Sequence, residues 1–155
     1  MRKFITPDAR GATCSLENND CTVRALTNAH PDMSYWVAHG LLEKAGRVRG
    51  QAVASPVWMP VYIAARFCPV ATFGTTKGAL ITKALIEKAA GKGAVPHNSG
   101  VTIANLLPTL NKNKRYIVKI RGHVFAVVEG MVIDKGVTKA EASVQAVFEY
   151  VPEIV

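Results

Sequence analysis

Apolar residues recur at helical spacing through the first two-thirds of the chain. The pattern predicts four helices, at about residues 21–28, 34–46, 77–90 and 102–110. We expect the first helix to be capped by Asn19 or Asp20, and the last to kink or end at Pro108, because proline cannot continue a helix. Residues 47–76 mix prolines and glycines with aromatic residues, which favours an ordered loop or short helices.

From Arg115 onward the apolar period changes to two. Strands are predicted at about residues 115–121, 123–128, 131–134 and 143–151, the first as an outer strand and the second as a central one. Glu129 and Gly130 form a two-residue turn in this prediction. Helices followed by strands predict an α+β fold, in which N-terminal helices (about 18–111) pack on a C-terminal antiparallel β-sheet (about 114–151) in a single domain over 1–155.

Composition supports one globular unit. About half of the 155 residues are apolar and 19% are charged, which is enough to build a core. The first residues lack the apolar run of a signal peptide, so we expect a cytoplasmic protein. Prolines and an arginine interrupt the most apolar stretch, residues 52–73, and we therefore expect no membrane span.

The formal net charge of +8 is compatible with nucleic acid, an anionic membrane or an acidic partner, and does not choose among them. The densest basic segments are residues 112–115 and the lysines of 77–92. Few aromatic residues interleave with them as stacking platforms would require, so a solvated surface is favoured over a nucleic-acid footprint.

Three cysteines cannot all pair within one chain. No C-x-x-C pair or short Cys/His spacing is present, so we expect neither a disulfide framework nor a metal site, and no cofactor. Cys14 and Cys68 are interpreted as structural thiols.

Cys21 is the candidate nucleophile, because the free N–H groups and dipole of a helix start favour a thiolate over a thiol. His123 opens the second predicted strand, and Asp134 ends the third. A two-residue turn places His123 diagonal to Asp134 on the same sheet face, where the carboxylate can hold one imidazole nitrogen while the other faces Cys21. A one-residue slip would turn Asp134 to the opposite face, and an exposed strand end is then its ordinary role. A lone buried cysteine is usually inert packing.

Residues 19–26, 114–118 and 122–130 resemble small bacteriophage-associated members of the papain-like cysteine peptidase superfamily, and the likeness is best over 18–46 and 102–134. The resemblance implies a nucleophile at Cys21, a general base at His123 and an orienting acid at Asp134. Such enzymes add a side-chain amide, commonly glutamine, to the oxyanion hole upstream of the cysteine. No glutamine precedes Cys21, so that role falls to Asn19 or Asn18, whose alternative role is helix capping.

The resulting functional prediction is a thiol hydrolase of peptidase or isopeptidase type, which forms an acyl-enzyme on a protein or peptide substrate. The same triad can also run acyl transfer. A phage-encoded protein would act in the host cytoplasm. The alternative is a catalytically silent papain-like phage protein that binds a host protein or nucleic acid.

Overall fold

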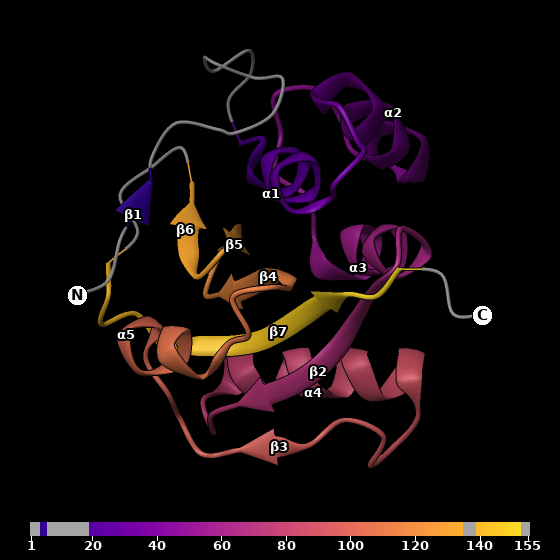
Figure 1. Cartoon of the computed structure of the whole chain (residues 1–155). Coiled ribbons are helices and arrows are strands. Elements are labelled where there is room, and N and C mark those ends of the chain that lie inside the picture. The colour runs from indigo at the N-terminus through magenta and orange to yellow at the C-terminus, as the bar shows by residue number, and fades with distance from the viewer. Residues whose placement is uncertain (1–3, 6–18, 135–138, 153–155) are drawn as a thin grey trace.

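One mixed β-sheet organises the described part of the chain, which comprises residues 4–5, 19–134 and 139–152 of a computed structural model (Figure 1). The strand order among these residues is β1-β6-β5-β4-β7-β2-β3. The strands are β1 (Phe4–Ile5), β2 (Phe67–Phe73), β3 (His97–Asn98), β4 (Arg115–Ile120), β5 (His123–Val128), β6 (Met131–Ile133) and β7 (Val144–Tyr150). The helices are α1 (Cys21–Ala29), α2 (Tyr35–Ala45), α3 (Ser55–Ala64), α4 (Lys77–Ala90) and α5 (Ile103–Leu106), and a 3₁₀ turn, η1 (Leu107–Thr109), follows the last.

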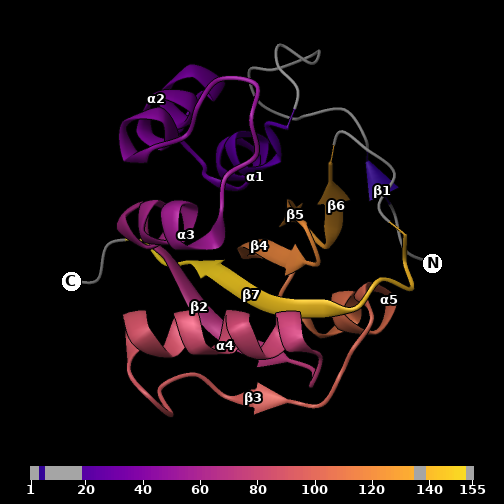
Figure 2. The ribbon, with the colours of Figure 1, turned by 180° about the vertical axis from the view of Figure 1, so that it is seen from behind.

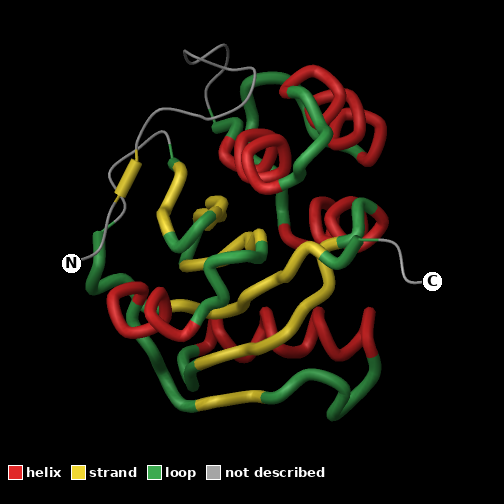
Figure 3. Tube along the Cα trace, viewed as in Figure 1, coloured by secondary structure: helices red, strands yellow, loops and turns green. Residues whose placement is uncertain are grey.

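Two hydrophobic clusters cover the two faces of the sheet. Helices α1 to α4 contribute to a cluster that includes Ile117 and Val124, whereas α5 and η1 pack with their strand neighbours Val118 and Phe125. Consecutive strand residues point to opposite faces, so the two clusters lie on opposite sides of the sheet. Seen from behind, α4 runs along β2 and β7 (Figure 2), and Figure 3 shows β3 at the edge of the sheet beyond β2. The mixed α and β content agrees with the predicted α+β class.

Several helices begin or end where their capping residues predicted. Ser34 accepts a hydrogen bond from the Val37 N–H at 3.3 Å, and α2 ends before Gly46, whose φ is 129°. Helix α4 has the predicted bounds and begins with the Thr76 side chain accepting from the Ala79 N–H. The helix after Thr102 is short, as predicted, and its continuation through Pro108 is the 3₁₀ turn.

The prediction of a purely antiparallel, C-terminal sheet is wrong. Strand β2 arises from the segment expected to be loop or short helix, and β1–β6 and β2–β3 are parallel pairs. The prolines in this segment made its sequence pattern look like that of a loop, so the strand was not predicted. Pro56 lies in the first turn of α3, where no N–H is needed, while Pro69 lies at a register irregularity between β2 and β7. Strand β4 is also not an outer strand, because it lies between β5 and β7.

The β5–β6 hairpin positions the candidate site. Val128 pairs with Met131 across the turn, as predicted, and Glu129 and Gly130 have φ values of 56° and 77°. Two consecutive residues at positive φ are typical of the type I′ turn, whose twist matches that of the strands. The predicted register is therefore confirmed. Among the described residues, no helix is long and apolar enough to cross a membrane.

Candidate functional site

Cys21 is the first residue of α1, and the structure anchors that end of the helix on both sides. The preceding Asp20 is 2% exposed and accepts hydrogen bonds from Arg24 Nε at 2.9 Å and the Tyr35 hydroxyl at 2.7 Å. The Tyr62 hydroxyl of α3 donates to the Thr22 carbonyl at 2.7 Å. These contacts hold the first turn of α1 against α2 and α3.

Asp20 was one of two residues expected to cap α1 with its side chain, and for Asp20 this expectation is wrong. Asp20 occupies the N-cap position of α1, but its side chain makes no capping hydrogen bond. Arg24 and Tyr35 engage both carboxylate oxygens instead. Because a buried carboxylate needs charged or polar partners, these two side chains compete successfully with the backbone N–H groups.

Asn19 lies beside the cysteine in sequence, but its amide points to the loop after α2. Its Nδ2 donates to the Gly50 carbonyl at 3.2 Å, and its own carbonyl accepts from Arg47 Nη2 at 3.3 Å. Its backbone has a φ of 57°, a conformation that asparagine tolerates better than most residues. Asn19 does not line the cavity at Cys21, and its oxyanion role stays a prediction. Asn18 and Cys14 lie outside the described residues.

His123 and Asp134 come together across the β5–β6 hairpin. His123 Nε2 lies 2.7 Å from Asp134 Oδ2, and the two side chains are 29% and 7% exposed. Cys21 and His123 line the same cavity, and Cys21 lies close enough to help raise the pKa of the His123 imidazole. The structure thus brings Cys21, His123 and Asp134 together at one end of the β5–β6 hairpin.

The charges around His123 favour its protonated form. Burial by itself lowers its pKa, but hydrogen bonds and charge interactions with Asp134 and Cys21 outweigh burial and raise the pKa from 6.5 to about 10. An imidazolium that persists through neutral pH stabilises a neighbouring thiolate by direct attraction.

A cavity of about 260 Å³ opens at Cys21 and His123. Its walls come from α1, the start of α3 and the β4–β5 hairpin, and they include Trp58 and Lys119. Sequence reasoning missed Lys119, because its alternation with apolar residues suggested an exposed strand face. Burial lowers the pKa of Lys119, consistent with a side chain held against the protein.

The arrangement has the parts of nucleophilic catalysis: a thiol, a base within hydrogen-bond reach and an acid that orients the base. The backbone N–H groups of the first turn of α1 have no acceptor within the helix, so they can stabilise a developing oxyanion. Within residues 4–5, 19–134 and 139–152, no group of three His, Cys, Asp or Glu side chains is suited to hold a metal ion.

Of the two other thiols, Cys68 is described. It is exposed on β2, not packed in the core as its interpretation as a structural thiol implied.

Comparison with protein-family models, curated proteins and solved structures finds no match to the chain.

Proposed function

We propose that this protein is a cysteine-nucleophile hydrolase of papain-like type, which cleaves peptide or isopeptide bonds. The observation that carries the proposal is the His123–Asp134 hydrogen bond of 2.7 Å, with Cys21 beside His123 in the wall of the same cavity. A histidine held on one side by a carboxylate and on the other by a thiol at a helix start is the geometry that thiol activation requires.

The mechanism follows from these contacts. His123 already carries the proton as an imidazolium, and the Cys21 sulfur attacks the carbonyl carbon of the substrate. The carbon–nitrogen bond then breaks, the leaving amine receives the proton from His123, and an acyl thioester remains on Cys21. Water next gives a proton to His123 while its oxygen attacks the thioester; the carbon–sulfur bond breaks, the acid is released, and the protonated imidazole and the free sulfur of the starting state return. Asp134 keeps the imidazole oriented in both halves, and the Cys21 backbone N–H stabilises the oxyanion.

The test is the pH dependence of Cys21 alkylation by iodoacetamide, mapped to each cysteine by mass spectrometry. Cys68 is an exposed thiol in the same chain and serves as the internal reference. The proposal expects Cys21 to react well below pH 8 and faster than Cys68, and expects His123→Ala to remove that advantage.

The second candidate is a protein that keeps this fold and binds a host protein or nucleic acid without catalysis. The engagement of the Asn19 amide with Gly50 favours it, because that amide was the expected second oxyanion donor. Equal alkylation of Cys21 and Cys68, unaffected by His123→Ala, supports this candidate over the hydrolase.

A further inference from the structure

Lys119 is a half-buried cation in the wall of the Cys21 cavity, and its hydrogen-bond partners are neutral. Its Nζ donates to Gln145 Oε1 and lies 3.5 Å from the Ile120 carbonyl oxygen. Within the described residues, no carboxylate forms an ion pair with it. A partly desolvated ammonium with no counter-charge is a natural partner for an anionic group supplied by a ligand.

A second and larger cavity is lined by Gln145, the hydrogen-bond partner of this lysine. It has a volume of about 890 Å³ and is lined by the start of α4, the start of β7 and the β4–β5 turn. Ile120 and Arg121 line this cavity, and the next two residues of the hairpin, Gly122 and His123, line the catalytic one. The Lys119–Gln145 hydrogen bond therefore lies where the two cavities adjoin.

Gln145 is built into the wall of the larger cavity. It is 6% exposed and falls at a register irregularity between β4 and β7, where an extra residue re-aims a side chain. Its Oε1 accepts from Lys119 and from Thr82 Oγ1, the latter at 3.2 Å. Because both contacts engage the oxygen, the amide nitrogen keeps its N–H groups to donate. Gly78 leaves room for that nitrogen, since a Cβ there would approach it to 3.1 Å.

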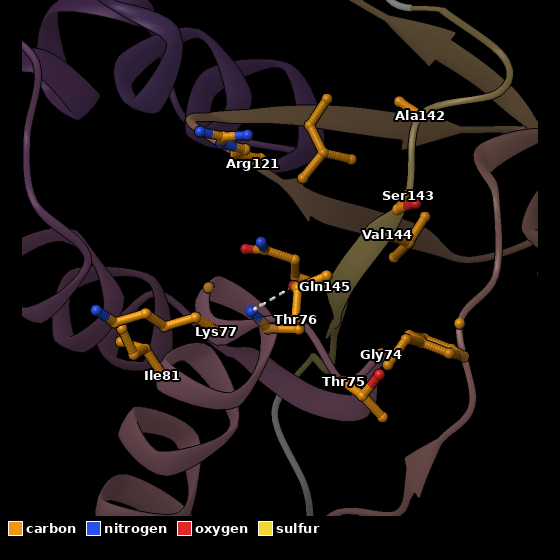
Figure 4. Close-up of a pocket in the computed structure, with 15 residues that line it drawn as sticks. Gly74, Thr75, Thr76, Lys77, Ile81, Arg121, Ala142, Ser143, Val144 and Gln145 are labelled. Carbon is orange, nitrogen blue, oxygen red and sulfur yellow. Dashed lines mark hydrogen bonds between the residues drawn. The ribbon is translucent and has the colours of Figure 1, made fainter.

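The charged side chains that line the larger cavity, Lys77 and Arg121, are both basic. Figure 4 shows Arg121 on one side of the larger cavity and Lys77 on the other, with the Gln145 side chain between them. The residues that line the two cavities include no aspartate and no glutamate. Cations and a buried amide donor without an acidic neighbour form an environment suited to a carboxylate.

We propose that a carboxylate of the substrate binds where the two cavities adjoin, through Lys119, Arg121 and Gln145, so that Cys21 acts on peptides with an acidic residue within three positions before the scissile amide. This inference rests on the proposed hydrolase function and names its substrate class. Lys119 and Arg121 act as specificity residues: they hold the substrate and take no part in proton transfer.

Binding is tested first, in a form that does not depend on thiol reactivity. The ¹⁵N-labelled protein is titrated with acetyl-Ala-Glu-Ala-amide and with its glutamine counterpart, and amide chemical shifts are followed by NMR. The glutamate peptide is expected to bind about tenfold more tightly, the size of one charge-assisted contact, and to shift the Gln145 side-chain amide. Arg121→Gln and Lys119→Met should each reduce that preference. Lys92→Gln removes an exposed charge away from both cavities and should leave the preference intact.

Reactivity is tested second, with peptide vinyl sulfones that carry glutamate or glutamine at each of the three positions before the electrophile. At one position the glutamate probe should label Cys21 about tenfold faster, and Arg121→Gln should bring the two rates together. Lys92→Gln, which removes an exposed charge outside both cavities, should leave both the glutamate preference and the iodoacetamide rate unchanged. Arg121 lies exposed in a turn, and its replacement leaves the core intact.

The outcomes separate the two proposals. Equal binding and equal labelling by glutamate and glutamine peptides, with His123-dependent alkylation of Cys21 retained, overturns the acidic-substrate inference and leaves the hydrolase. Preferential binding of the glutamate peptide to a protein whose Cys21 is inert overturns the hydrolase, and with it the claim that the acidic peptide is a substrate. A short single-stranded RNA that shifts the same resonances at lower concentration than the peptide identifies a nucleic-acid surface and also overturns the inference.

Discussion

His123 Nε2 lies 2.7 Å from Asp134 Oδ2; His123 begins β5, and Asp134 directly follows β6, which a two-residue turn joins to β5. The carboxylate therefore orients the imidazole through a rigid element of the sheet. Sites supported by paired strands hold their geometry more closely than sites built on loops. The Cys21 end of α1 is anchored independently by Asp20 and Tyr62, so both halves of the site are fixed before a substrate arrives.

Replacing Asp134 tests its orienting role. We expect Asp134→Asn to slow alkylation of Cys21 at pH 6.5 by about tenfold or more, because an amide removes the negative charge that stabilises the imidazolium. The measurement is the iodoacetamide rate at Cys21 relative to Cys68, by mass spectrometry. Asp134→Glu restores the charge and should recover part of the rate. An unchanged rate in Asp134→Asn contradicts the orienting role.

The raised pKa of His123 predicts how stability depends on pH. The folded protein holds this proton more tightly than the unfolded chain, so the stabilisation is fully present below pH 6.5 and disappears as pH rises through about 10. We expect His123→Gln to lower the free energy of unfolding at pH 6 by on the order of 3 kcal/mol. The difference from wild type should shrink steadily toward pH 10. Urea unfolding at intervals of pH gives both curves, and a constant difference across the range contradicts the prediction.

The buried Asp20 carboxylate is expected to be important for folding. Asp20→Ala removes the carboxylate that pairs with the buried Arg24 guanidinium at 2.9 Å, and we expect a loss of about 3 kcal/mol or more in the free energy of unfolding. Tyr35→Phe removes one neutral donor to the same carboxylate and should cost about 1 kcal/mol. Urea denaturation measures both. Equal effects of the two variants would show that the Asp20–Arg24 pair adds no more than a single hydrogen bond.

The elements that could be predicted from the sequence are those determined by neighbouring residues. Ser34 and Thr76 cap helices whose apolar spacing is regular, and Glu129-Gly130 selects one turn type and therefore one strand register. Because that register relates His123 to Asp134, the contact between them was also predictable. The start of α1 at Cys21 was predicted as well, although Asp20, one of the two residues that indicated it, makes no capping hydrogen bond.

The elements that could not be predicted depend on distant partners. Strand β2 forms because it pairs with β7, far away along the chain, and neither Pro60 nor Pro69 indicates such a pairing. The contact of Lys119 with Gln145 depends on the irregular β4–β7 register, which no local pattern encodes. Asp20 was expected at a cap, and the approach of Tyr35 from α2 gave it another role.

The turn that sets the register provides the last prediction. Gly130 has a φ of 77°, and a Cβ at this position would lie 3.3 Å from Lys112 Cγ. We expect Gly130→Ala to lower the free energy of unfolding by about 1–2 kcal/mol, because an L side chain is disfavoured at positive φ.

Gly93→Ala is the matched control, since its φ is 80° and nothing lies within 4 Å of the added methyl. Both variants pay the cost of an L side chain at positive φ, so any extra loss of free energy of unfolding in Gly130→Ala measures the contact with Lys112. If thermal and urea unfolding show the same loss for Gly130→Ala as for Gly93→Ala, the Lys112 side chain moves aside freely. If Gly130→Ala also slows Cys21 alkylation, the turn contributes to the alignment of His123 with Asp134.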